Sequence, residues 1–147
     1  MKSKIVANSA NGRAFVLVLD PGEEAFGAIT AFAKAENVKG ASLTALGAFE
    51  RATVGWFDLA KRDYPKIEIA EQCEALSLIG DVAIDDSGAP SLHLHAVLGL
   101  SDGSTRGGHL LRASVRPTLE VMLKETPSEL RRKKRPELGL ALIDLTS

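Results

Sequence analysis

Short apolar runs dominate the chain from Ala41 onward, and they limit its fold more than any other feature of the sequence. Most of them alternate apolar and polar residues, which is typical of strands with one buried face. Turn signals such as Ser101-Asp102-Gly103 separate the runs. One run, 118–123, fits a strand or a helix on pattern alone, and its shortness favours a strand. The expected strands after Ala41 are 42–49, 52–59, 67–70, 75–84, 92–100, 107–115, 118–123 and 140–145.

The first forty residues combine one strand with one helix. Residues 15–19 form a β-branched and aromatic run between two turn signals, which indicates a buried strand. A helix start follows, because Asp20 can cap a helix and Pro21 suits its first position. Apolar residues then repeat at helical spacing before Gly40, at Phe26, Ile29 and Ala33. We therefore expect an α+β fold, a mostly antiparallel β-sheet meander with one long helix near the N-terminus.

Length and composition indicate a single domain over residues 1–147, with 45% hydrophobic and 25% charged residues. The net charge of −1 argues against a dedicated non-specific DNA-binding protein. No apolar run has membrane-spanning length and the N-terminus lacks a secretory pattern, so we expect a cytoplasmic protein with no membrane partner. The single Cys73 could be a redox thiol or a further metal ligand, and the sequence favours a buried, inert thiol.

The densest charge in the chain is a basic run of five residues, Arg131-Arg132-Lys133-Lys134-Arg135. Such a run can contact nucleic acid or serve as a targeting signal. It can equally be a solvated loop or short helix, softened here by Glu129 and Glu137. No aromatic residue lies within the run to stack on bases, and the solvated reading is favoured.

All three histidines fall in one stretch, His93, His95 and His109. His93 and His95 are two apart on an expected strand and point to one face. A two-residue turn at Asp102-Gly103 would turn His109 to the other face. A three-residue turn through Ser104 would place it diagonal to His95, and a bulge at 107–108 would also correct the face. Three converging imidazoles suit a divalent transition metal such as zinc, with a fourth coordination position open. The alternative is that one or two of the histidines only form hydrogen bonds in the core or at a subunit interface.

Several segments together resemble the plants-and-prokaryotes-conserved domain. They are residues 92–99, 101–103 and 107–110, with further matching pieces at 12–17, 45–52, 76–80 and 139–144. The resemblance implies an α+β domain with an antiparallel sheet, assembled as a homotrimer, in which His93, His95 and His109 are the metal ligands. For DNA binding the resemblance gives only an analogy. The plant members bind DNA through an Arg-Gly-Arg-Pro hook, and this chain lacks that segment.

The histidine pattern is also similar to the zinc site of acetolactate decarboxylases. That resemblance implies a metal acting as a Lewis acid on a hydroxy-keto acid, with an acid or base and a carboxylate-binding cation nearby. Arg112 follows His109 by three residues and is expected on the opposite face of a regular strand. The sequence leaves Glu50, Arg51 and Glu74 unplaced, so we assign no catalytic residue and no cofactor site besides the metal.

Three classes of function remain open at this point. A metal- or metabolite-binding interaction module and a metal-dependent small-molecule enzyme, a lyase or hydrolase, rank close together. A DNA-binding protein ranks below both because of the charge balance.

Overall fold

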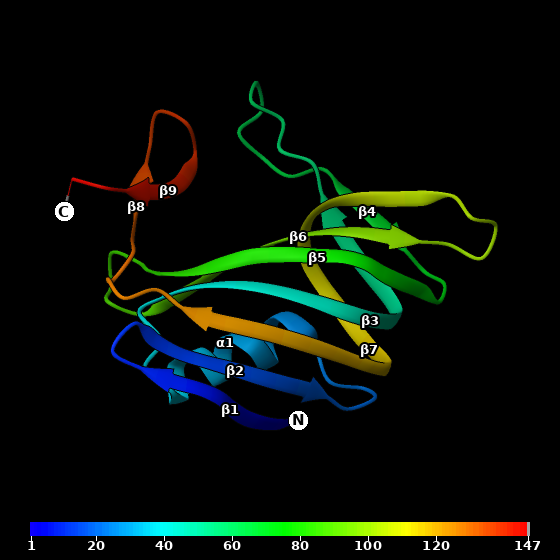
Figure 1. The fold of residues 1–147 in the computed structure, drawn as a ribbon. Helices are drawn as coiled ribbons and strands as arrows, with labels where there is room; N and C mark the ends of the chain where they lie inside the picture. The colour runs from blue at the N-terminus through cyan, green and yellow to red at the C-terminus, as the bar shows by residue number, and fades with distance from the viewer. Residues whose placement is uncertain (147) are drawn as a thin grey trace.

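The computed structural model describes residues 1–146, and this range contains nine strands and one helix (Figure 1). The elements in chain order are β1 (Lys2–Ser9), β2 (Gly12–Leu19), α1 (Ala25–Ala35), β3 (Gly40–Gly55), β4 (Lys66–Ile69), β5 (Cys73–Ile84), β6 (Pro90–Gly99), β7 (Thr105–Glu125), β8 (Arg131–Arg135) and β9 (Leu140–Asp144).

All nine strands belong to one sheet, in the order β1-β2-β7-β3-β5-β8-β9, with β4 paired to β3 and β6 paired to both β5 and β7. The strand β7 is 21 residues long, and different parts of it pair with different strands. Its beginning, 105–109, pairs with β6, while residues 109–125 pair with β3. Because β3 pairs with β5 and β5 with β6, these four strands close a ring of hydrogen-bonded neighbours.

The helix and one face of the sheet enclose the core. Alternate residues of β6 are buried on this face, namely Leu92, Leu94, Ala96 and Leu98. The helix packs against β6 and β7, and Phe32 on the helix meets Phe15 of β2 edge to face, with ring centroids 5.1 Å apart. Since side chains alternate along a strand, His93 and His95 point away from the core, onto the outer face of the sheet.

The expected α+β fold with a long helix is wrong, because the chain is mostly β and α1 has only 11 residues. Residues Asp20-Pro21-Gly22 form a turn in place of the helix start, with Gly22 at a positive φ of 86°. The helix is capped instead by Glu24, whose carboxylate accepts hydrogen bonds from the backbone N–H groups of Phe26 and Gly27. This helix is neither long nor apolar enough to cross a membrane, and the described residues contain no other.

The expected meander is also wrong, because the sheet is mixed. The strand β8 runs parallel to β5, and β7 lies between β2 and β3. The expected strands 42–49 and 52–59 are one strand that ends at Gly55, and 107–115 and 118–123 are both part of β7. Two strands were not expected at all. The first, β1, is an exposed edge strand without a buried face, and the second, β8, is the basic run.

Candidate metal centre

A tight turn between β6 and β7 brings the three histidines together. The backbone N–H of Leu100 donates to the Ser104 carbonyl, which leaves a three-residue turn at 101–103. Gly103 adopts a φ of 81°, which favours glycine, and the Asp102 carboxylate accepts hydrogen bonds from the Ser104 backbone and hydroxyl. The turn therefore has the odd length that places His109 on the outer face, but it begins one residue earlier than expected. As a result His109 lies directly opposite His95 and not diagonal to it.

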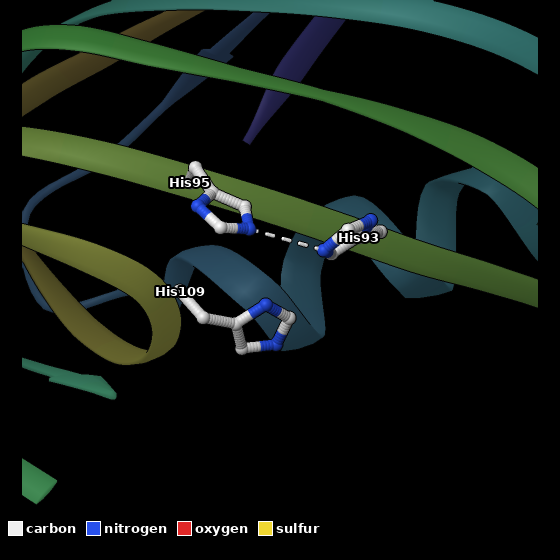
Figure 2. A group of neighbouring side chains, drawn as sticks. All are labelled: His93, His95 and His109. Atoms are coloured by element: carbon white, nitrogen blue, oxygen red, sulfur yellow. Dashed lines mark hydrogen bonds between the residues drawn. The ribbon is translucent and has the colours of Figure 1, made fainter. Parts of the chain in front are cut away.

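The three imidazoles converge on one point of the outer face (Figure 2). The Nε2 atoms of His93 and His95 lie 3.2 Å apart, and each histidine offers a nitrogen within 4.8 Å of the other two. A tetrahedral zinc ion with bonds of about 2.0–2.1 Å separates two nitrogen ligands by about 3.3 Å. The spacing of His93 and His95 fits such an ion, and His109 faces them from the neighbouring strand.

The surroundings of His109 favour a neutral ring with a free lone pair. Burial, with smaller contributions from the other two histidines, lowers the pKa of His109 to about 4. Burial also lowers the pKa of His93, assisted by the charge of Arg132. The Nδ1 atom of His109 is buried, and no hydrogen-bond partner for it lies within residues 1–146. A neutral, buried and unpartnered imidazole nitrogen is a suitable metal ligand.

Tyr64 closes one side of the histidine cluster. Its ring packs against that of His109 at a tilt of 35°, with centroids 4.9 Å apart, and it also packs against Phe57. The tyrosine rests on Gly55, where an added Cβ would lie 3.0 Å from the Tyr64 Cβ atom. Gly55 ends β3, so Phe57 and its neighbour Trp56 lie beyond the strand on which they were expected. Trp56 is 64% exposed and belongs to no core.

A carboxylate that the sequence did not single out lies next to His93. Asp81 on β5 is the direct cross-strand partner of His93, and its Oδ2 atom lies 3.9 Å from the Nδ1 atom of His93. The other oxygen of Asp81 forms an ion pair with Arg132, which is 6% exposed. An acid within the apolar run 75–84 is the sequence signal that could have drawn attention to Asp81.

The basic run is a strand and neither a loop nor a short helix. Four of its five cations lie within 4 Å of a carboxylate. Besides the Arg132–Asp81 pair, Arg131 lies 2.6 Å from Glu129, Lys133 lies 2.9 Å from Asp144, and Arg135 lies 3.7 Å from Asp144. Asp144 is itself buried. Much of the charge of the run is therefore neutralised within the chain.

Arg112 lies on the same face as His109, contrary to the sequence-based expectation. The pairing of β7 with β3 shifts by one residue at Leu111, so that Leu110 pairs with Val54 but Arg112 pairs with Thr53. This bulge restores Arg112 to the outer face, where it lines a groove of about 780 Å³ with Arg51 and Lys66.

The remaining polar candidates lie away from the histidines. Glu50 interacts with Arg116 at 3.7 Å and with Arg51 at 3.9 Å. Glu74 pairs with Gly99, near the opposite end of β6 from His93. Cys73 is buried, and burial raises the pKa of its thiol, as in an inert cysteine.

The sequence model of one family, the Plants and Prokaryotes Conserved (PCC) domain, matches residues 6–127 of the chain. The chain belongs to this family. The match contains the whole histidine cluster and Asp81, whereas Arg132 lies beyond its end.

Solved structures similar to this PCC chain come from archaea and bacteria. A plant- and prokaryote-conserved protein of Pyrococcus horikoshii is 32% identical, with 93% of this chain and 94% of the other covered and a TM-score of 0.86. A metal-containing protein of Archaeoglobus fulgidus is 34% identical, with 91% and 94% covered and a TM-score of 0.83. A candidate DNA-binding protein of Bacteroides thetaiotaomicron is 26% identical, with 99% and 98% covered and a TM-score of 0.91. No curated protein matches the chain.

Proposed function

We propose that the protein is a metal-binding PCC module, in which His93, His95 and His109 bind a divalent transition metal, with zinc as the favoured ion. The observation that carries the proposal is the convergence of three imidazoles, with 3.2 Å between the Nε2 atoms of His93 and His95. The similar Archaeoglobus protein is described as containing metal, which supports the same assignment here. A bound zinc ion would act as a Lewis acid with one coordination position open to a small molecule.

The residues around the cluster favour an anionic small molecule as the ligand. In the single chain His95 is exposed, so the cluster opens onto the outer face. Lys66 pairs with Gly55, which in turn pairs with His109, so one cross-strand row joins the groove to the histidines. Lys66, Arg51 and Arg112 line this groove together with one carboxylate, Glu68, so positive charge prevails there on the metal-bearing face.

An enzyme of the acetolactate decarboxylase type, a lyase or a hydrolase, is the second candidate. The position of Arg112 favours it, because such chemistry needs a cation near the metal to bind a carboxylate. The carboxylate beside the cluster, Asp81, is already engaged in an ion pair with Arg132. We therefore rank the binding module first and assign no catalytic residue.

A homotrimer is the proposed assembly, following the family resemblance. An exposed apolar surface supports self-association, because its area would otherwise face water. Met122, Thr44, Ile79 and His95 are successive cross-strand partners on the outer face. Other exposed apolar residues of the same strands are Leu46, Leu76 and Val97.

DNA binding ranks third, although two similar structures are named as candidate DNA-binding proteins. The net charge of −1 and the ion pairs of the basic run both oppose it. We propose a cytoplasmic location, since a buried, unpaired Cys73 agrees with a reducing compartment.

Elemental analysis of protein purified without a histidine tag tests the metal assignment. We expect about one zinc or similar ion per chain in the wild type. The His95→Ala variant should lose the ion, whereas Glu74→Ala, an exposed residue on β5, should keep it. Wild-type protein that stays metal-free after incubation with zinc would rule the proposal out.

A further inference from the structure

The ring of His93 has two nitrogens with different surroundings. Its Nε2 atom faces Nε2 of His95, and its Nδ1 atom faces the Asp81 carboxylate at 3.9 Å. Histidine ligands usually direct the nitrogen that does not bind metal toward a carboxylate or carbonyl group. At 3.9 Å, Asp81 acts on His93 through its charge and not through a hydrogen bond. That charge favours a proton on Nδ1, which leaves the Nε2 lone pair directed toward the other histidines.

The Asp81 carboxylate is itself held in place by Arg132. One carboxylate oxygen pairs with Arg132, and the other faces His93. Arg132 is 6% exposed, and its second guanidinium nitrogen lies 3.5 Å from the Ser91 carbonyl oxygen at the start of β6. Arg132 therefore contacts both β5 and β6, the two strands that carry Asp81 and His93.

Arg132 comes from the C-terminal hairpin, which has few other connections to the sheet. The hairpin consists of β8 and β9 and lies at one end of the molecule (Figure 1). Its backbone joins β5 through a single pairing, Ile84 with Arg131, next to the hydrogen bond from the Ile84 N–H to the carbonyl of Leu130, which precedes β8. One more backbone contact follows, from the Lys134 N–H to the Asp86 carboxylate just after β5. The Arg132 side chain thus links the docked hairpin to the histidine cluster.

We propose that Asp81 and Arg132 are positioning residues of the metal centre, through which the docked C-terminal hairpin orients His93. The inference rests on the proposed function, since it assumes that the three histidines bind metal. The hairpin lies beyond the matched family region, which ends at residue 127, and the inference makes it part of the metal centre. Because binding energies are reciprocal, metal binding at the cluster must also stabilise the docked hairpin.

Metal affinity tests the two residues directly. We would measure the dissociation constant for zinc by competition with a chelator, and record the visible absorption spectrum of the cobalt(II) form. Asp81→Asn and Arg132→Met should each weaken zinc binding about 10–100-fold, as is usual for residues behind a metal ligand, and should alter the cobalt spectrum. Arg131→Met, the neighbouring residue on β8, is the matched control and should change the affinity less than about twofold.

Thermal unfolding identifies a variant that has simply lost its fold. Asp81→Asn is the safer change, because it keeps the size of the side chain and leaves β8 intact. In the double variant, the two losses should be far from additive, because either change alone breaks the same chain of contacts.

Amide hydrogen exchange provides a second readout that does not depend on affinity. Zinc should slow exchange across residues 131–144 in the wild type but not in Asp81→Asn. If wild type binds zinc and His95→Ala does not, while Asp81→Asn and Arg132→Met bind like Arg131→Met, the inference is overturned and the proposed function stands. If His95→Ala keeps its zinc, the proposed function itself is wrong.

Discussion

His95 and His109 are direct cross-strand partners, although 13 residues and a turn separate them along the chain. The pairing depends on a three-residue turn and places both imidazoles on the outer face of the sheet. Tyr64 packs against the ring of His109 and rests on Gly55. Asp81 faces His93 and forms an ion pair with Arg132. The cluster is therefore defined by backbone register as much as by the histidines themselves, and disturbing the backbone should affect it.

Gly80 on β5 is the position where a small backbone change should disturb the cluster most. A Cβ atom there would lie 2.0 Å from the carbonyl oxygen of His93. Gly80→Ala should therefore push β6 away, lower the free energy of unfolding by about 1–3 kcal/mol and weaken zinc binding. Chemical denaturation and chelator competition would measure the two effects. Unchanged stability and affinity would show that β6 tolerates the shift.

Arg112 should contribute to binding of an anion at the zinc-loaded cluster. With oxalate as the probe, Arg112→Gln should weaken binding about tenfold, the loss of one charge-assisted hydrogen bond. Arg106→Gln is the control, because Arg106 lies three residues before His109 on a regular stretch of β7 and points to the other face. Titration calorimetry would measure both. Equal oxalate affinity in the two variants would show that Arg112 does not contribute to anion binding at the cluster.

Met122 tests the outer face as an assembly surface. This residue is 54% exposed and lies in the cross-strand row that leads through Thr44 and Ile79 to His95. Met122→Glu should convert the expected trimer into monomers, because burial of an unpaired carboxylate is unfavourable. Lys34→Glu, on the exposed side of α1, should leave the trimer intact. Sedimentation equilibrium would distinguish the species, and a monomeric wild type would contradict the proposed assembly.

Glu125 links stability to pH through its contacts with Arg13. Three hydrogen bonds from Arg13 hold the pKa of this carboxyl below its ordinary value of 4.5. Because the pKa is lower in the folded state, the stabilisation is complete above pH 4.5 and is lost as the pH falls through the folded pKa. Glu125→Gln should thus cost about 2 kcal/mol at pH 7.

The difference between wild type and Glu125→Gln should narrow steadily below pH 4.5. Urea unfolding between pH 3 and pH 7 would follow it, with Glu120→Gln, an exposed residue of the same strand, as the control. If the difference in unfolding free energy between the two proteins stays constant over this range, the charge of the Glu125 carboxylate does not contribute to stability.

Strands with one buried face could be predicted from the sequence, as β5 and β6 illustrate. Their apolar residues alternate because every second side chain enters the core. The strand β1 has no such signal, because its residues are exposed on both faces and its only strand partner among the described residues is β2. The long helix was expected because Asp20 and Pro21 resemble a helix start, whereas Gly22 directs the chain into a turn. The basic strand β8 was missed because its charges are neutralised in part by carboxylates of other strands, Asp81 and Asp144.

The sequence by itself determined that His93 and His95 share one face, because alternation along a strand is a local property of the backbone. It also showed that the face on which His109 lies depends on the length of one turn. The tertiary structure alone decided that His109 lies opposite His95, that the bulge at Leu111 turns Arg112 to the same face, and that Arg132 reaches Asp81. These relationships join segments far apart along the chain, so they depend on strand register and packing, which no local pattern encodes.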